Sequence, residues 1–246
     1  MKKLFVLFIA VLMIIGVAAC TPTTTTDINA KSEGVMTYAE YEAAAIDSAV
    51  VIEAFVQDHQ SWWDNKITVY AQDKDGAYFL YEMACSEADA AKLVPGTKIK
   101  VTGTKAEWSG EVEIADATFE FEEGSYIADP VDVTNLLGTD DLIKKMNQKV
   151  SFKGMTVVAS KVAGDDTEHA FLYKWNNSGE QGDDLYFNVA IGDNTYTFTV
   201  ESYLRGKDTD VYKAVEALNI GDVIDLEGFL YWYNGANPHI TAVTVK

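Results

Sequence analysis

One stretch of this chain occurs twice, and the duplication constrains the fold more than any other feature. The first copy reads Leu93-x-x-Gly96-x-x-Ile99-x-Val101-x-Gly103-x4-Trp108-x-Gly110, and the second reads Leu218-x-x-Gly221-x-x-Ile224-x-Leu226-x-Gly228-x4-Tyr233-x-Gly235. Five of the seven aligned positions are identical, and the two exchanges are Leu for Val and Tyr for Trp. An internal repeat of this kind indicates two copies of one structural unit. In a chain of 246 residues we therefore expect two small domains, each long enough to bury a core without disulfides.

The residues around the first copy predict strands joined by tight turns. We expect strands over 49–57, 66–72, 77–83, 97–105 and 111–121, and short helices over 38–46 and 86–93. Asp73-Lys74-Asp75-Gly76 is typical of a hairpin turn, because short polar side chains bond back to the backbone and glycine adopts a positive φ. Alternation along the hairpin predicts an inward and an outward set of side chains, respectively Ile67, Val69 and Leu80, and Tyr70, Phe79 and Tyr81.

The second half of the chain follows the same order with looser agreement. Strands are expected over 150–160, 170–175, 185–191, 195–200, 223–231 and 238–245, and helices over 140–146 and 209–218. A polar insertion over 176–184 separates two of these strands. Gly154 stands in the first of them, where a glycine suits a strand that coils around a small barrel.

The order strand, strand, strand, short helix, strand, strand resembles the oligonucleotide/oligosaccharide-binding (OB) fold superfamily. The resemblance is closest in the Leu-x-x-Gly-x-x-Ile-x-Val-x-Gly passage that begins at Leu93 and leads into the fourth strand. It implies an all-β protein with short helices, built as two tandem five-stranded OB-like Greek-key barrels. The first barrel is expected over 37–125 and the second over 147–246. A linker with a short helix joins them over 126–146.

The N-terminus predicts export and a lipid anchor. A basic start, Met1-Lys2-Lys3, precedes an apolar run over 4–15, which is too short for a membrane span, and small residues then lead to Cys20. This arrangement resembles a bacterial lipoprotein signal peptide over 1–19, with Cys20 as the lipidated residue, and an ordinary secretory signal is the alternative. A disordered tether over 20–36 would follow, holding the protein at the extracytoplasmic face of the cell membrane. Cys85 is then left alone and is expected to be a buried core residue.

Catalytic and metal-binding patterns are absent from the sequence. No zinc-protease, nucleophile-elbow or phosphate-loop motif is present, and the three histidines are scattered. The acidic turns lack the spacing of a calcium loop. We therefore expect a protein that is not an enzyme and has neither a metal nor another cofactor.

The overall charge argues against a polyanionic partner. The formal net charge is −19, and Arg205 is the only arginine. Nucleic-acid recognition usually depends on basic surfaces and arginine forks, so the sequence disfavours nucleic acid as a partner.

Aromatic residues are the strongest signal for a binding site. The OB resemblance implies that a ligand lies across the second and third strands, between the strand 1–2 and strand 4–5 loops. The candidate residues are Trp62, Trp63, Tyr70, Tyr81 and Trp108 in the first barrel, and Trp175, Trp232 and Tyr233 in the second. Aromatic rings in such a groove stack on bases or sugars. Two alternatives stay open, that some rings are core residues or that the outer aromatic face packs against the other barrel.

These observations predict a lipid-anchored extracytoplasmic binding or adaptor protein. Its expected partners are the membrane, through the lipid on Cys20, and a glycan, a cell-wall component or a surface protein. Hydrogen bonds to the ligand are expected from Asp58, Gln60, Asp64 and Asn65. Two other hypotheses are a surface protein that binds single-stranded nucleic acid and a structural envelope spacer with no small ligand.

Overall fold

The computed structural model of the chain describes residues 30–164 and 166–246, and strands dominate this part. The proposed signal peptide over 1–19 and Cys20 lie outside the described residues. The strands of the first barrel are β1 (Ala49–His59), β2 (Lys66–Gln72), β3 (Ala77–Ala84), β4 (Thr97–Trp108) and β5 (Glu111–Ser125). Those of the second half are β6 (Val131–Asp132), β7 (Lys149–Val158), β8 (Leu172–Tyr173), β9 (Leu185–Ile191), β10 (Asn194–Val200), β11 (Val223–Phe229) and β12 (His239–Val245).

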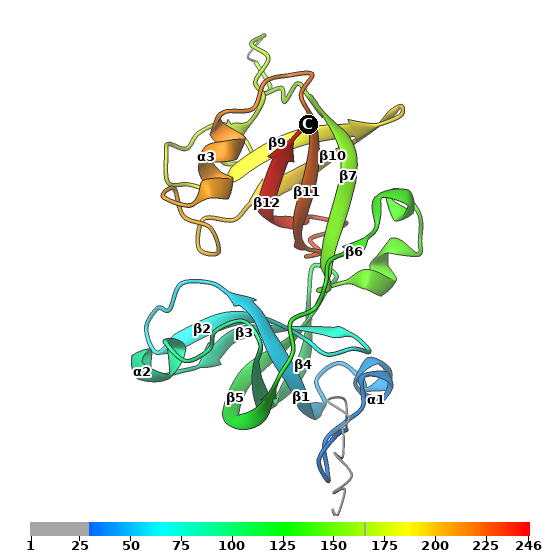
Figure 1. Cartoon of the computed structure of the whole chain (residues 1–246), viewed down its shortest axis with the longest axis vertical. Coiled ribbons are helices and arrows are strands. Elements are labelled where there is room, and N and C mark those ends of the chain that lie inside the picture. The colour runs from blue at the N-terminus through cyan, green and yellow to red at the C-terminus, as the bar shows by residue number, and fades with distance from the viewer. Residues whose placement is uncertain (1–29, 165) are drawn as a thin grey trace, which may run out of the picture.

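The helices in the described ranges are short. The α-helices are α1 (Tyr38–Ala43), α2 (Glu87–Ala90) and α3 (Asp210–Glu216), and the 3-10 helices are η1 (Thr134–Leu136) and η2 (Leu142–Lys145). None of the described helices has the length and hydropathy needed to cross a bilayer. The two barrels lie one above the other along the long axis of the molecule, joined by the segment that carries β6 (Figure 1).

Both barrels have the same strand order. Barrel 1 closes in the order β1-β2-β3-β5-β4, with β3 and β5 parallel. In barrel 2 the additional pairing of β7 with β9 closes the ring β7-β9-β10-β12-β11, with β10 and β12 parallel. Each strand of the first ring therefore has a counterpart at the same place in the second ring. The predicted pair of five-stranded OB-like barrels is confirmed.

The repeated motif has the same structural role in each barrel. Gly96 and Gly221 have φ angles of 94° and 97°, which glycine adopts without steric cost where the chain turns into the fourth barrel strand. Gly103 and Gly228 stand where strands approach closely. A β-carbon on Gly103 would lie 2.6 Å from the Ile114 side chain, and one on Gly228 would overlap the backbone of His239. The repeat is therefore conserved within the chain because the geometry of both barrels requires it.

The predicted hairpin register is correct. Val69 pairs with Leu80 and both side chains are buried in the barrel 1 core, whereas Tyr70 pairs with Phe79 and both point outward. The predicted core position of Cys85 is also confirmed, since it is a free, buried thiol. The end of the predicted tether is folded against barrel 1. Here the Lys31 ammonium group lies 2.7 Å from the Asp73 carboxylate.

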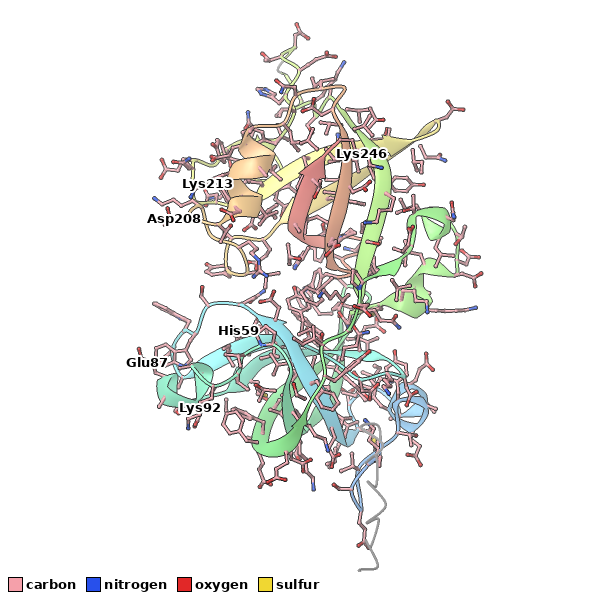
Figure 2. The ribbon with its side chains drawn as sticks, in the orientation of Figure 1. His59, Glu87, Lys92, Asp208, Lys213 and Lys246 are labelled. Atoms are coloured by element: carbon pink, nitrogen blue, oxygen red, sulfur yellow. The ribbon has the colours of Figure 1, made fainter. Side chains whose placement is uncertain are left out.

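The outward face of the β2–β3 hairpin packs against barrel 2. The Tyr70 ring stacks on Phe229, with centroids 4.4 Å apart, and its hydroxyl lies 2.6 Å from Nδ1 of His239. Phe79 packs against Tyr231 at 5.2 Å. Figure 2 shows side chains filling the space between the barrels. The alternative that the aromatic face packs against the other barrel is therefore correct for this part of the face.

Polar contacts tie the barrels together around this apolar centre. Arg205 of barrel 2 forms an ion pair with Asp58 of barrel 1. The backbone N–H of Trp232 donates to Oε2 of Glu111 at 2.8 Å, and the N–H of Asn234 donates to the Ser109 carbonyl at 2.7 Å. The last of these bonds joins the strand 4–5 loops of the two barrels. The tails of the two repeat copies therefore meet each other.

Candidate ligand-binding groove

Barrel 2 has an open groove at the position that the OB resemblance implies. It has a volume of about 800 Å³ and lies across β9 and β10, between the loop that follows β7 and the loop between β11 and β12. Its lining residues are Ser160, Lys161, Leu172, Trp175, Tyr186, Asn188, Thr197, Tyr233, Ala236 and Asn237. We call this the barrel 2 groove.

Three aromatic rings from separate segments line the barrel 2 groove. Trp175 is 73% exposed and Tyr233 is 53% exposed, and they come from the two loops at its edges. Tyr186 is half-buried on β9. Burial, followed by the nearby carboxylates of Asp184 and Glu201, raises the pKa of the Tyr186 hydroxyl, so this group stays protonated as a hydrogen-bond donor. The groove therefore offers flat apolar faces with a polar group among them.

Local backbone contacts fix the position of Trp175. Lys174, immediately before it, has a φ of 60°, and its N–H donates to the Asp184 carbonyl at 2.8 Å. Asn177 donates its backbone N–H to the Lys174 carbonyl and closes a turn around the indole. The exposed tryptophan therefore stands on a hydrogen-bonded turn next to the short pairing of β8 with β9.

The polar lining is organised across the two strands. Asn188 on β9 lies opposite Thr197 on β10, and the threonine hydroxyl donates to Oδ1 of Asn188 at 2.7 Å. The Asn188 amide also donates to the Ala159 carbonyl at 3.3 Å. On the far side of the groove, Oδ1 of Asn237 accepts a hydrogen bond from the Thr199 hydroxyl at 2.8 Å. These bonds hold the amide groups in fixed orientations.

The charge of the barrel 2 groove differs from that of the whole chain. Lys161 is the one charged residue among the described residues that line it, and its ammonium group lies 3.1 Å from the exposed Glu168 carboxylate. No carboxylate is part of this described lining, although the chain as a whole has a formal net charge of −19. The lining is therefore close to neutral, because the Glu168 carboxylate pairs with Lys161, the cation among its described residues.

A second hollow, of about 480 Å³, lies where the two barrels meet. Its lining residues are Gln60, Ser61, Trp63, Lys66, Ile67, Thr68, Tyr81, Glu82 and Tyr203. We call this the junction hollow. Trp63 is 79% exposed and Tyr81 is 43% exposed, while Lys66 and Glu82 form an ion pair at 2.7 Å. Tyr203 belongs to barrel 2, and its carbonyl accepts the backbone N–H of Ser61 at 2.8 Å. The Glu82 carboxylate makes this hollow less suited to an anion than the barrel 2 groove.

Three of the predicted binding residues have structural positions instead. Trp62 packs against the barrel 1 core and donates its indole N–H to the Cys85 carbonyl at 2.9 Å. Tyr70 is fully buried between the barrels and has no exposed surface for a ligand. Trp232 is half-buried, and a β-carbon on Gly110 of the other barrel would lie 3.0 Å from its ring. The prediction for Tyr70 is therefore wrong, because a pattern of aromatic residues does not distinguish an exposed ring from one buried between barrels. Trp62 and Trp232 keep part of their surface, and ligand binding by them stays a prediction.

The remaining candidates fall into separate places. Trp175 and Tyr233 come together in the barrel 2 groove, and Trp63 and Tyr81 come together in the junction hollow. Trp108 is 62% exposed but lines neither of them. Asp58, expected to bond a ligand, is held by Arg205 instead.

Some lining residues were not predicted from the sequence. The clearest are Tyr186 and Ser160 in the barrel 2 groove and Tyr203 in the junction hollow. Strand alternation around the buried residues Leu185 and Phe187 was a signal for Tyr186, whereas Tyr203 follows β10 in an irregular segment with no repeating pattern. No group of three or more histidine, cysteine or acidic residues in the described ranges has the geometry to hold a metal ion.

The comparisons with known proteins gave matches among solved structures alone. No family model matches it. No curated protein matches it either. Solved HIN-domain structures match most of its length. The tetrameric p202 HIN2 structure is 12% identical, with a TM-score of 0.34 over 82% of this chain and 96% of that one.

Two further matches are described as complexes with double-stranded DNA. The Ifi202 HINa domain with 20 base pairs of DNA is 12% identical, with a TM-score of 0.35 over 81% of this chain and 98% of that one. A murine DNA-binding protein with double-stranded DNA is 10% identical, with a TM-score of 0.36 over 80% of this chain and 94% of that one.

The prediction that nucleic acid is a poor partner is corrected on this point. Two of these structures are described as complexes with double-stranded DNA, at TM-scores of 0.35 and 0.36. Their ligands are properties of those proteins. For this chain, the net charge of −19 does not describe the lining of the barrel 2 groove, which has no carboxylate among its described residues.

Proposed function

We propose that this protein is a non-enzymatic binding protein that holds single-stranded nucleic acid in the barrel 2 groove by stacking unpaired bases on Trp175 and Tyr233. The observation that carries the proposal is the pair of exposed rings at the two edges of a groove whose described lining contains no carboxylate. Stacking on aromatic side chains contributes about 1–3 kcal/mol per base and tolerates any base, because every base has a π-face.

The charge distribution supports contacts to bases rather than to phosphates. Lys161 is the single cation in the described lining, and the rest of the chain is strongly acidic. A protein that neutralises several phosphates loses affinity steeply as the salt concentration rises. On a single strand, each neutralised phosphate contributes only about −0.7 to the slope of the logarithm of the binding constant against the logarithm of the salt concentration. We therefore expect a shallow salt dependence, because stacking does not release counterions.

Single strands fit this groove better than a duplex does. Stacking on Trp175 and Tyr233 needs a base whose face is accessible, and a duplex covers the faces of its bases with neighbouring pairs. Duplex binding through the backbone would instead need a basic surface. The proposed location at the membrane rests on Cys20, which lies outside the described residues, and stays a prediction.

The test is a fluorescence titration of the full chain with a labelled single-stranded oligonucleotide at about 50 mM and about 200 mM salt. Binding should change by no more than about threefold between the two conditions, which corresponds to one phosphate contact. Trp175→Ala should weaken binding about tenfold, since it removes one stacking face. Trp108→Ala is the matched control, because it removes an equally large exposed indole outside both hollows and should leave affinity unchanged.

Two results would reject the proposal. One is retention of oligosaccharides with no binding of any oligonucleotide, which would assign the groove to sugars. The other is tighter binding of duplex than of single strands with a steep loss of affinity in salt, which would place binding on a charged surface instead of the groove.

A further inference from the structure

The junction hollow is lined by three exposed aromatic side chains that the proposed function does not use. Trp63 and Tyr81 belong to barrel 1 and Tyr203 belongs to barrel 2, and they are 79%, 43% and 68% exposed. A single exposed ring is ordinary on a protein surface, but several around one hollow are typical of a binding site. The hollow is therefore a candidate for a second kind of ligand.

Backbone contacts hold the segments that carry these rings. Trp63 and Lys66 exchange two backbone hydrogen bonds, at 3.0 and 2.9 Å, across a tight turn. On the barrel 2 side, the Tyr203 carbonyl accepts the N–H of Ser61 at 2.8 Å and its hydroxyl at 3.2 Å. The hollow is therefore largely formed before a ligand arrives, which reduces the entropy lost on binding.

The charge around the junction hollow is negative. Lys66 and Glu82 line it as an ion pair. The hydrogen bond to Glu82, followed by the charges of Glu82 and Asp64, raises the pKa of the Lys66 ammonium group. Burial, followed by the carboxylates of Glu82 and Glu113, raises the pKa of the Tyr81 hydroxyl. Three carboxylates therefore act here against one ammonium group, which favours a positively charged ligand.

Aromatic faces next to carboxylates attract organic cations. The electron-rich face of a tryptophan or tyrosine ring stabilises an ammonium group that lies within about 6 Å of its centre. The chain forms this contact at another place, where the Lys105 ammonium group lies 5.1 Å from the centre of the Tyr41 ring. Around the junction hollow, the exposed rings offer the same interaction to a ligand.

We propose that the junction hollow binds an organic ammonium group, with its charge beside the Glu82 carboxylate and its carbon atoms against Trp63, Tyr81 and Tyr203. A volume of about 480 Å³ leaves room for an ammonium group that carries methyl groups. Such groups are held through aromatic faces rather than through hydrogen bonds, and the exposed rings supply these faces. The inference does not rest on the proposed function, because it concerns a different hollow.

Lys66 is a competitor of the ligand at this site. Its ammonium group lies 2.7 Å from Glu82, so it occupies the carboxylate beside which the ligand would bind. The Lys66 side chain is 52% exposed, and exposed ion pairs contribute little to stability, so the lysine turns into water at little cost. Removing its charge should therefore strengthen the binding of a cation, whereas it would weaken the binding of an anion.

The experiment titrates the full chain with choline at constant ionic strength and follows tryptophan fluorescence. The neutral control is the tert-butyl analogue of choline, in which carbon replaces the charged nitrogen and the shape is kept. Choline should bind at least about tenfold more tightly than this analogue, because the cation alone gains from the ring faces and the carboxylate. Sodium chloride should give no saturable signal.

Four variants test the position of the site. Trp63→Ala and Glu82→Gln should each weaken choline binding about threefold to fivefold, whereas Lys66→Gln should strengthen it about threefold. Trp108→Ala is the matched control, because it removes an exposed indole outside the junction hollow and should leave the affinity unchanged. All four side chains are exposed, so the thermal midpoints of the variants should stay close to that of the unmodified protein.

Four results would overturn the inference. They are no saturable binding of choline, equal binding of choline and its neutral analogue, weaker binding in Lys66→Gln, and unchanged binding in both Trp63→Ala and Glu82→Gln. A chain that binds choline as expected but binds no oligonucleotide would reject the proposed function alone.

A peptide with one trimethyllysine distinguishes the sources of the ammonium group. Tighter binding of the peptide than of choline would support a protein side chain as the source, and the opposite order would support a free small ion.

Discussion

Glu111 shows how one residue sets the chemistry of the joint between the barrels. Its side chain is fully buried, and burial raises the pKa of its carboxyl group from 4.5 to about 8. Oε2 accepts the Trp232 N–H, but Oε1 has no partner, and Oδ1 of the neighbouring Asn147 also has none. Because burial is the largest of the effects on this group and outweighs the hydrogen bonds from Asn147 and Trp232, the neutral carboxyl group is the form that fits the joint.

This residue predicts a pH-dependent stability. Between pH 4.5 and about 8, the folded protein keeps a proton on Glu111 that the unfolded chain has released, so the free energy of unfolding falls as pH rises. The contribution of Glu111 is at most about 1.4 kcal/mol per pH unit. Glu111→Gln removes the titration and supplies a donor, so its stability relative to the unmodified protein should increase steadily between these pH values. Denaturant unfolding across this range measures the difference, and parallel curves for the two proteins would show that Glu111 does not titrate there.

At the scale of strands and turns, the sequence predicted most of the fold. The repeat gave the number of barrels, and alternation at Val69 and Leu80 gave the hairpin register. The same alternation gave the outward direction of Tyr70 but not what it faces. Local sequence patterns record which side of a strand is apolar, whereas the contact with Phe229 depends on how two distant segments pack. This is why the candidate site was only partly predicted.

Gly228 provides a test of the close approach between β11 and β12. A β-carbon there would overlap the His239 backbone, which no side-chain movement relieves. Gly228→Ala should therefore lower the free energy of unfolding by about 3 kcal/mol, the upper end of the range for overpacking. Gly206→Ala is the control, because its β-carbon would lie 3.7 Å from the nearest atom, at ordinary contact distance. Similar stabilities for the two variants in chemical denaturation would contradict this account of the repeat.

For the whole molecule, the decisive feature is that the barrels share a buried contact. Tyr70 and Phe79 from barrel 1 meet Leu204 and Phe229 from barrel 2 in one apolar cluster, and the Arg205–Asp58 ion pair lies between the same two units. Interfaces of this kind make two domains unfold together when their contact energy is comparable to their individual stabilities. We therefore expect one cooperative transition for the chain.

Phe229→Ala should uncouple the barrels. The substitution removes the ring that stacks on Tyr70 and should cost about 3–5 kcal/mol at the joint. Calorimetry should then resolve two transitions, and small-angle scattering should give a larger radius of gyration. Phe121→Ala, which removes a 41% exposed ring of barrel 1, should preserve the single transition. A single transition in both variants would mean that the barrels cooperate through other contacts.

The meeting of the two strand 4–5 loops has a consequence for valency. Ser109 and Asn234, from equivalent loops, bond to each other, and the β2–β3 face of barrel 1 is covered at Tyr70 and Phe79. Duplication would ordinarily give a bivalent molecule, whose avidity grows when both copies bind the same strand. Among the described residues, the barrel 2 copy keeps its groove open across both strands, whereas the face of barrel 1 is open only at the junction hollow with Trp63 and Tyr81. The two copies should therefore not act as equivalent binding sites: the barrel 2 groove binds the strand, and the covered part of barrel 1 supports barrel 2.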